Sequence, residues 1–433
     1  MDFVKEIGKE SRESLGRAKK YWERLGPGLT TGAADDDPSG IATYSQAGAQ
    51  TGFRLLWLAP LTFPLMAVIQ EMCARIGLVT GRGLAANIRM HYPRAVLYGS
   101  TALLFAANTF NVAVDLGAMA AVTRLLFPRA GYLFLIFAFT AISLALQIFL
   151  PYRKYAKYLK YLALFLFSYV ASAFLVGLDW GEVMRHAVIP SLEFSKKELL
   201  LVAAMLGTTI SPYLFFWQTS QEVEEEILAG KNTIAKREAV SLPEIRDMRR
   251  DVWTGMFVSN LVMFFIIAAC AGTLYAHGIT DIRTAEEAAL ALAPFGGRYA
   301  LILFALGIIG TGLLSLPILA GGAAYAIAES FRWKEGLSRT LKHAHAFYGV
   351  LALSMALGMA LNFFRLDPMK GLLYSAVANG IIAPVILFLV VRISDDKNIM
   401  GEHANKPLVS SLGWNITRLM ALISIVTLYS LTF

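Results

Sequence analysis

Long apolar stretches separated by short polar segments dominate the hydropathy pattern of this 433-residue chain. A helix needs about 20 consecutive, mostly apolar residues to cross a bilayer. Stretches of about that length lie at 27–50, 55–79, 97–122, 131–150, 158–178, 199–219, 253–276, 298–328, 346–364, 371–392 and 411–431. The pattern therefore predicts an all-α polytopic membrane protein with about 11 transmembrane helices.

Polar residues interrupt two of these stretches. Residues 35–40 in the first stretch read Asp-Asp-Asp-Pro-Ser-Gly, and residues 206–213 in the sixth read Leu-Gly-Thr-Thr-Ile-Ser-Pro-Tyr. Proline and glycine break a membrane helix and free backbone carbonyls, which is tolerated where the backbone lines a cavity. Interrupted helices at equivalent positions of two halves are the best sequence indication of a transporter binding site.

The first and sixth stretches are equivalent if the first ten helices form two repeats of five. Because five is odd, the second repeat would run inverted through the membrane. We expect an amphipathic segment at 1–24, a first repeat at 25–180, a second repeat at 199–393 and an eleventh helix at 411–433. The repeat is inferred from position alone, because the halves share no obvious residue identity.

Lysine and arginine are concentrated in alternate connecting segments. With a cytoplasmic N-terminus, the inside segments 1–24, 80–94, 151–160, 221–252, 331–343 and 392–406 hold 27 of the 39 basic residues. The positive-inside rule therefore predicts a multi-pass protein of the cell membrane with a cytoplasmic N-terminus and an external C-terminus. We expect the basic segment 1–24 to lie along the anionic inner leaflet.

Composition narrows the function classes. The chain is 56% hydrophobic and 16% charged, which is the composition of a membrane protein. In such a protein the positions of lysine and arginine matter more than their sum, so the net charge of +8 does not indicate a nucleic-acid partner. Both cysteines lie in apolar stretches, which favours buried thiols over a disulfide. No nucleophile–base pair, phosphate-binding loop or HExxH motif is present, so enzymatic function is not supported. The expected partners are the bilayer and a transported ion, with no further cofactor and a monomer as one possible state.

Acidic residues inside the apolar stretches are the first functional candidates, since a carboxylate in lipid costs several kcal/mol. Asp37 falls near the middle of the first stretch. If the helix began only at Ile41, too few residues would remain before 51–54 to cross a membrane. Asp115 is a lone acid in the third stretch, and is either a second cation or proton site or a carboxylate bonded to a neighbouring helix. The acidic run 221–226 is expected to be a solvated helical extension, with a cation-concentrating vestibule as the alternative.

Hydroxyl groups surround the second interruption. Thr208, Thr209 and Ser211 could each be structural, because serine and threonine often bond the backbone inside membrane helices. The repeat argument, however, places them opposite Asp37. Together with freed carbonyls they would complete an oxygen-rich cage for a cation.

Several short motifs resemble the Nramp family of divalent metal transporters. They are Gly26-Pro-Gly28, the Asp37-Pro38-x-x-Ile41-Ala42-Thr43 run, Gln46-Ala-Gly48 and residues 74–81, and the likeness continues through Asp115-Leu116 and 207–212. The resemblance implies the inverted-repeat, LeuT-like fold of amino-acid:sodium transporters, with a metal site at the broken helices. It also implies that Asp37 and the backbone carbonyls of Ala34 and Thr208 bind the metal.

The chain departs from the family pattern at the site itself. The family's Asp-Pro-Gly-Asn motif has Ser39 and Gly40 in its last two positions here, and its Met-Pro-His motif reads Ser211-Pro212-Tyr213. The methionine sulfur is a soft ligand that favours transition metals, whereas the serine oxygen is hard. The missing asparagine side chain is expected to leave a roomier site. The likeness is therefore closest to the Nramp-related magnesium transporter branch, which also carries Mn²⁺.

We expect alternating access that imports a partly hydrated Mg²⁺, driven by the membrane potential. Proton coupling is not expected, because the family's acids in the third helix are replaced by Asn108 and Ala118, leaving Asp115. The predicted metal ligands are Asp37, Ser211, Thr208, Ala34 and Gly40. Residues of the surrounding cavity are predicted to be Asp35, Asp36, Ser39, Thr209, Tyr213, Asp115 and Asn379. Two alternatives remain: a proton-coupled Mn²⁺ or Fe²⁺ importer that uses Asp115, and an amino-acid or organic-cation symporter on the same fold.

Overall fold

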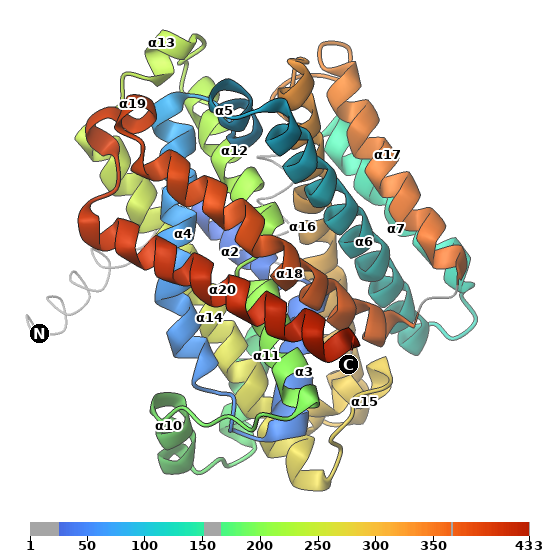
Figure 1. Cartoon of the computed structure of the whole chain (residues 1–433). Coiled ribbons are helices and arrows are strands. Elements are labelled where there is room, and N and C mark those ends of the chain that lie inside the picture. The colour runs from blue at the N-terminus through green and yellow to red at the C-terminus, as the bar shows by residue number, and fades with distance from the viewer. Residues whose placement is uncertain (1–25, 151–165, 365–366, 433) are drawn as a thin grey trace, which may run out of the picture.

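The computed structural model describes residues 26–150, 166–364 and 367–432, and every regular element in these ranges is a helix (Figure 1). The long helices are α4 (Leu58–Thr80), α6 (Arg94–Leu126), α7 (Tyr132–Phe149), α14 (Leu242–Thr273), α16 (Gly297–Phe331), α17 (His345–Leu361), α18 (Pro368–Asp395) and α20 (Pro407–Thr432). Shorter helices are α5 (Leu84–His91), α9 (Phe167–Leu175), α10 (Trp180–Val188), α13 (Ile234–Arg237), α15 (Ala285–Ala289) and α19 (Lys397–Met400). The predicted all-α class is confirmed.

Two of the predicted spans are each divided into two helices. The first consists of α2 (Pro27–Asp35) and α3 (Pro38–Thr51), and the sixth consists of α11 (Lys196–Thr209) and α12 (Pro212–Leu228). Among the described residues, nine helical segments are long and apolar enough to cross a membrane, with α11 and α12 counted together. Two of the eleven predicted spans are not among these nine. The first is divided into two short helices, and residues 158–165 of the fifth lie outside the described residues. The prediction of two broken helices is confirmed.

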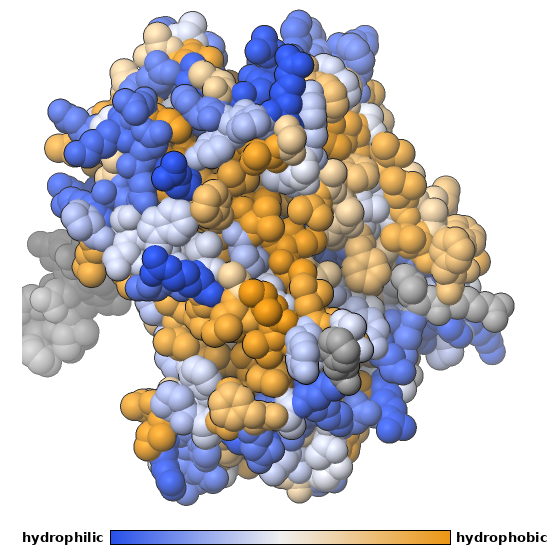
Figure 2. Space-filling model, viewed as in Figure 1, coloured by the Kyte–Doolittle hydropathy of each residue, from blue (hydrophilic) through white to orange (hydrophobic). Residues whose placement is uncertain are grey.

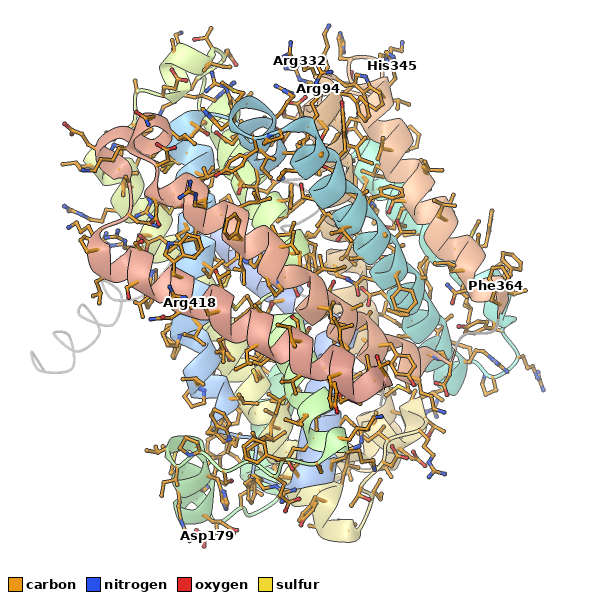
Figure 3. The ribbon with its side chains drawn as sticks, in the orientation of Figure 1. Arg94, Asp179, Arg332, His345, Phe364 and Arg418 are labelled. Atoms are coloured by element: carbon orange, nitrogen blue, oxygen red, sulfur yellow. The ribbon has the colours of Figure 1, made fainter. Side chains whose placement is uncertain are left out.

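The surface is divided into an apolar belt and two polar ends. On the face shown in Figure 2, apolar residues extend across much of the middle, and hydrophilic residues gather mainly at the upper and lower ends. We call the upper end, with α5, α13 and α19, the α13 end, and the lower end, with α10 and α15, the α15 end (Figure 1). Arg94, Arg332 and His345 lie at the α13 end, and Asp179 lies at the α15 end (Figure 3). This distribution is that of a multi-pass membrane protein.

Glycines allow the half-helices to approach their neighbours closely. A Cβ atom at Gly207 of α11 would lie only 2.1 Å from the carbonyl oxygen of Ala376 in α18. A Cβ atom at Gly32 of α2 would lie 2.3 Å from the carbonyl oxygen of Gly255 in α14. Any side chain at these positions would push the helices apart, because contacts this short do not occur without a backbone shift. The glycines therefore set the positions of α2 and α11, on which the candidate site depends.

The prediction that residues 221–226 form a solvated extension is wrong. Helix α12 continues to Leu228, and Glu222, Glu224 and Glu226 are each at most 6% exposed. Their carboxylates have partners inside the protein: Gln218 lies 2.8 Å from Glu222, Tyr325 2.8 Å from Glu224 and Lys231 3.1 Å from Glu226. Gln218 lies one turn earlier on α12 and Lys231 follows its end, whereas Tyr325 is supplied by α16, which the hydrophilic sequence alone could not reveal. The expectation of two buried, unpaired cysteines, Cys73 and Cys270, is confirmed.

Candidate functional site

The first break lies between α2 and α3. Asp36 leaves the helical conformation with φ −85° and ψ 47°, and Asp37 is extended with φ −66° and ψ 173°. One carboxylate oxygen of Asp37 accepts a 2.7 Å hydrogen bond from the backbone N–H of Gly40, so Asp37 caps α3. Pro38 has no N–H and cannot donate to the carbonyl four residues earlier. The carbonyl of Ala34 is therefore free of that helical hydrogen bond.

The second break repeats this arrangement between α11 and α12. Ser211 is extended, with φ −90° and ψ 131°, and Pro212 begins α12. Four residues before this proline is Thr208, whose carbonyl likewise lacks its helical donor. The hydroxyl of Ser211 donates instead, at 2.5 Å to the carbonyl oxygen of Thr208 and at 2.8 Å to that of Gly207. The two prolines thus free the carbonyls of the two residues that were predicted to bind metal through their backbone.

The two breaks meet through Tyr213. Its hydroxyl lies 3.3 Å from the carbonyl oxygen of Ala34 and 3.5 Å from a carboxylate oxygen of Asp37. On the other side, Gly40 faces Thr208, since a Cβ atom at Gly40 would lie 3.3 Å from the Thr208 hydroxyl. That hydroxyl is buried and makes no hydrogen bond. The exposed fraction is at most 1% for Ala34, Asp37, Thr208, Ser211 and Tyr213. The breaks therefore enclose a buried set of oxygen atoms.

Gly40 leaves less space than the missing asparagine suggests. A Cβ atom there would lie 2.9 Å from the carbonyl oxygen of Asp35, as well as close to Thr208. The end of α2 occupies the volume next to Gly40, so the expected enlargement at this position is not found. Even an alanine would require the backbone of α2 to shift.

Asp35 and Asp36 face a different helix from Asp37. The hydroxyl of Ser259 in α14 donates to Asp35 at 2.8 Å and lies 3.5 Å from Asp36. Both acids are buried, with exposed fractions of 0% and 2%, and the second oxygen of Asp35 has no partner. In the described ranges, no three His, Cys, Asp or Glu residues converge as a metal-binding group. The adjacent aspartates therefore do not form one carboxylate cluster.

The remaining predicted residues make contacts around these breaks. Asp115 accepts a 2.6 Å hydrogen bond from Ser315 of α16, and its other oxygen is buried without a partner. The Thr209 hydroxyl lies 3.2 Å from that of Tyr44. Ser39 is buried, and its hydroxyl has no hydrogen-bond partner. Asp115 is thus bonded to a neighbouring helix, which was one of its two predicted roles. Its second oxygen remains unbonded and could still accept a proton or a cation.

Helix α6 carries a polar face on which sequence reasoning identified Asn108 and Asp115 but missed Asn111. Asn108 donates to the carbonyl of Leu319 at 2.8 Å, and Asn111 donates to the side-chain oxygen of Asn379 at 3.2 Å. The spare amide oxygens of Asn108 and Asn111 are buried without partners, as is the amide nitrogen of Asn379. With Asp115 these residues recur at helical spacing on one side of α6. That spacing was the signal available in the sequence, but the partners are supplied by α16, for Asn108 and Asp115, and by α18, for Asn111.

Asp251 of α14 is a second residue that sequence reasoning missed. Its carboxylate accepts hydrogen bonds from three backbone N–H groups at the start of α2, at 2.6, 2.9 and 3.2 Å. More than 220 residues separate the partners. No local motif signals such a contact.

The comparisons with known proteins agree with this architecture. A family model described as natural resistance-associated macrophage protein-like, Nramp, matches residues 28–430. A manganese transporter from Eremococcus coleocola, solved with an aromatic bis-isothiourea substituted compound, aligns with a TM-score of 0.75 and 17% identity over 94% of this chain and 86% of that one. MhsT in complex with L-phenylalanine aligns with a TM-score of 0.57 and 14% identity over 94% of this chain and 98% of that one.

A third solved structure widens the comparison. Mhp1, a nucleobase-cation-symport-1 family transporter, aligns with a TM-score of 0.56 and 15% identity over 93% of this chain and 90% of that one. These likenesses confirm the predicted LeuT-like fold. Because the family model extends over nearly the whole chain, this multi-pass membrane protein belongs to the Nramp family.

Proposed function

We propose that this protein transports a partly hydrated Mg²⁺, and also Mn²⁺, by alternating access at the two helix breaks. The observation that carries the proposal is the meeting of Asp37, the Ala34 carbonyl and the Tyr213 hydroxyl within hydrogen-bonding distance. The second break adds the Thr208 and Ser211 oxygens from the opposite repeat. These groups would bind the ion as substrate, in place of the hydrogen bonds that they now make to each other.

The chemistry of these groups favours a hard cation. Mg²⁺ prefers oxygen ligands in an octahedral arrangement and keeps several of its waters. Only Asp37 is a carboxylate at the point where the breaks meet, and the others are carbonyl or hydroxyl oxygens. So small a set leaves coordination positions for water. Ser211, standing where the family's motif has a methionine, removes the thioether that would favour softer metals.

The proposed driving force is the membrane potential. Asn108, at one of the positions where the family's motif has an acid, donates its amide to the carbonyl of Leu319 and has no titratable proton to transfer. Two positive charges crossing 100 mV release about 4.6 kcal/mol, at about 2.3 kcal/mol per charge. That energy supports about a thousandfold accumulation, at about 1.4 kcal/mol per tenfold.

The proposed direction is import toward the α13 end. Arg94 and Arg332 lie at this end, and Asp179 lies at the other (Figure 3). Positively charged loops favour the cytoplasmic side. The α13 end would therefore be cytoplasmic, with the C-terminus external.

Uptake of Mg²⁺ and Mn²⁺ by proteoliposomes tests the proposal. Asp37→Asn removes the charge but keeps an oxygen that can cap α3, so it should abolish uptake without unfolding the protein. Ser211→Met should raise the preference for Mn²⁺ over Mg²⁺, whereas Ser211→Ala, which only removes the hydroxyl, should not. Unchanged Mg²⁺ uptake by Asp37→Asn, or an unchanged metal preference in Ser211→Met, would contradict the proposed site.

A second candidate function is proton-coupled import of Mn²⁺. Its support is the fold shared with a manganese transporter and the spare, buried oxygen of Asp115. Strong inhibition by Cd²⁺ together with indifference to millimolar Mg²⁺ would favour this function. So would acidification of the liposome interior in fixed proportion to metal entry, measured with a pH-sensitive dye.

A further inference from the structure

The first turn of α2 is capped by a residue from another helix. Gly26 stands at the N-cap position and offers no side chain to bond the free N–H groups. Asp251 of α14 takes this role: one of its oxygens accepts from Gly26 at 2.9 Å and Leu29 at 3.2 Å, and the other accepts from Gly28 at 2.6 Å. A carboxylate at a helix N-terminus is favoured by the unpaired N–H groups and by the helix dipole. Asp251 is only 5% exposed.

Next to this cap, the backbones of α2 and α14 are in direct contact. A Cβ atom at Gly28 would lie 2.6 Å from the backbone of Val252, the residue after Asp251. A Cβ atom at Gly255 would lie 2.1 Å from the carbonyl oxygen of Gly28. Backbone contacts this close fix the register of α2 on α14. The three hydrogen bonds of Asp251 therefore act on a helix that is already in contact along its length.

Helix α2 also contacts α12. The hydroxyl of Thr31 donates to the side-chain oxygen of Gln218 at 2.5 Å, and Gln218 in turn donates to Glu222 at 2.8 Å. At its other end, α2 does not continue into α3, because the helix stops at Asp35 and the backbone turns at Asp36. α2 is thus a nine-residue helix whose start is bonded to α14 and α12 and whose last residue directly precedes a break in the helical backbone.

This placement bears on how an ion would leave. The candidate site is buried, so an element must move to open it, and α2 extends from the break toward the α13 end (Figure 1). We propose that Asp251 is a positioning residue that latches α2 in the closed position, and that release toward the α13 end requires the three capping bonds to break. The inference rests on the proposed transport function, because a latch matters only if the site must open.

Thiol labelling tests the latch without any metal. Thr31→Cys, in a background where Cys73 and Cys270 are replaced by alanine, places a reactive group under α2, where Thr31 is 0% exposed. In this background Asp251→Ala should raise the labelling rate at least about tenfold, which corresponds to a shift of about 1.4 kcal/mol. Asp251→Asn, which keeps one acceptor oxygen, should give a smaller increase.

Asp247→Asn is the matched control. Asp247 lies one turn earlier on α14, is exposed, and pairs at 3.7 Å with the exposed Arg250. Its substitution should leave the labelling rate unchanged. The latch is overturned if Asp251→Ala labels at the background rate, or if the control shows the same increase.

Transport kinetics distinguish a latch from a merely structural role. A weakened latch lowers the population that accepts the ion at the α15 end, so the apparent KM should rise in inverse proportion to that population. A structural defect would instead lower Vmax through loss of folded protein and leave KM unchanged. Asp251→Glu keeps the carboxylate and should restore part of the wild-type KM.

The two proposals fail in different ways. Faster labelling in Asp251→Ala without Mg²⁺ uptake by the wild type would reject the proposed substrate and keep the latch. Mg²⁺ uptake by the wild type with unchanged labelling in Asp251→Ala would reject the latch and keep the substrate.

Discussion

At the scale of single residues, two prolines explain most of the candidate site. Pro38 and Pro212 each remove the donor for a carbonyl four residues earlier, which frees Ala34 and Thr208. This chemistry is local and can be derived from the sequence. The contact of Tyr213 with both Ala34 and Asp37 could not be derived, because it depends on how two helices 170 residues or more apart approach each other.

Gly40→Ala provides a test of the close contact at the first break. The added methyl group would lie 2.9 Å from the carbonyl oxygen of Asp35, so the end of α2 must move. Overpacking of this kind costs about 1–3 kcal/mol, and we expect Mg²⁺ uptake efficiency to fall about tenfold or more.

Gly99→Ala is the control for that substitution. A Cβ atom at Gly99 of α6 would meet nothing within 4 Å, so this alanine should change uptake by less than about twofold. Full activity in Gly40→Ala would show that the site is looser than the closed structure.

Asp115→Asn separates the uncoupled mechanism from the proton-coupled one. Ser315 donates to Asp115, and it can donate equally to the amide oxygen of asparagine. If the acid does not carry protons, Mg²⁺ uptake should stay within about twofold of the wild type at every pH. Loss of uptake, or loss of an existing pH dependence, measured in proteoliposomes buffered at several pH values, would instead assign the proton to Asp115.

At the scale of elements, the half-helices are placed by two features: the breaks that separate them and the close helix–helix contacts at which they pack. The breaks follow from the local sequence, and the predicted positions at 35–40 and 206–213 are those observed. The crossings depend on glycines such as Gly207 and Gly255, whose partners lie on distant segments. A glycine in a membrane helix predicts close packing somewhere, but not the helix that it will face.

Pro212→Ala tests whether the second break is needed. Alanine restores the N–H and relieves the restriction that proline places on Ser211, so α11 and α12 can join and the Thr208 carbonyl can accept a helical bond. We expect folded protein with Mg²⁺ uptake reduced at least about tenfold, since a freed carbonyl is lost from the site.

Pro384→Ala is the matched substitution. Pro384 lies inside α18, which continues through it as one helix. Uptake should be retained, because no break depends on this proline. A similar loss of uptake in both variants would mean that proline matters for folding rather than for the site.

At the scale of the whole molecule, hydropathy predicts the spans because each segment that crosses the membrane must be an apolar helix that satisfies its own backbone hydrogen bonds. It failed at the acidic run of α12, since Glu222 and Glu224 are buried, with Gln218 of the same helix bonding Glu222 and Tyr325 of α16 bonding Glu224. The same limit applies to Asp251, whose partners on α2 are remote in sequence. Local patterns therefore predicted the approximate number of spans and the two interruptions, whereas the contacts that hold α2 required the assembled fold.

The proposed driving force predicts how far the protein can concentrate its substrate. In proteoliposomes with a potassium gradient and valinomycin, an interior of −60 mV should hold Mg²⁺ at about a hundredfold excess, since two charges release about 2.8 kcal/mol. Without the gradient, internal and external Mg²⁺ should become equal. Proton coupling predicts that a pH gradient alone would also drive accumulation, whereas an uncoupled transporter would not respond to it. Uptake measured with each gradient separately, and with Asp37→Asn as the inactive control, decides which free energy the protein uses.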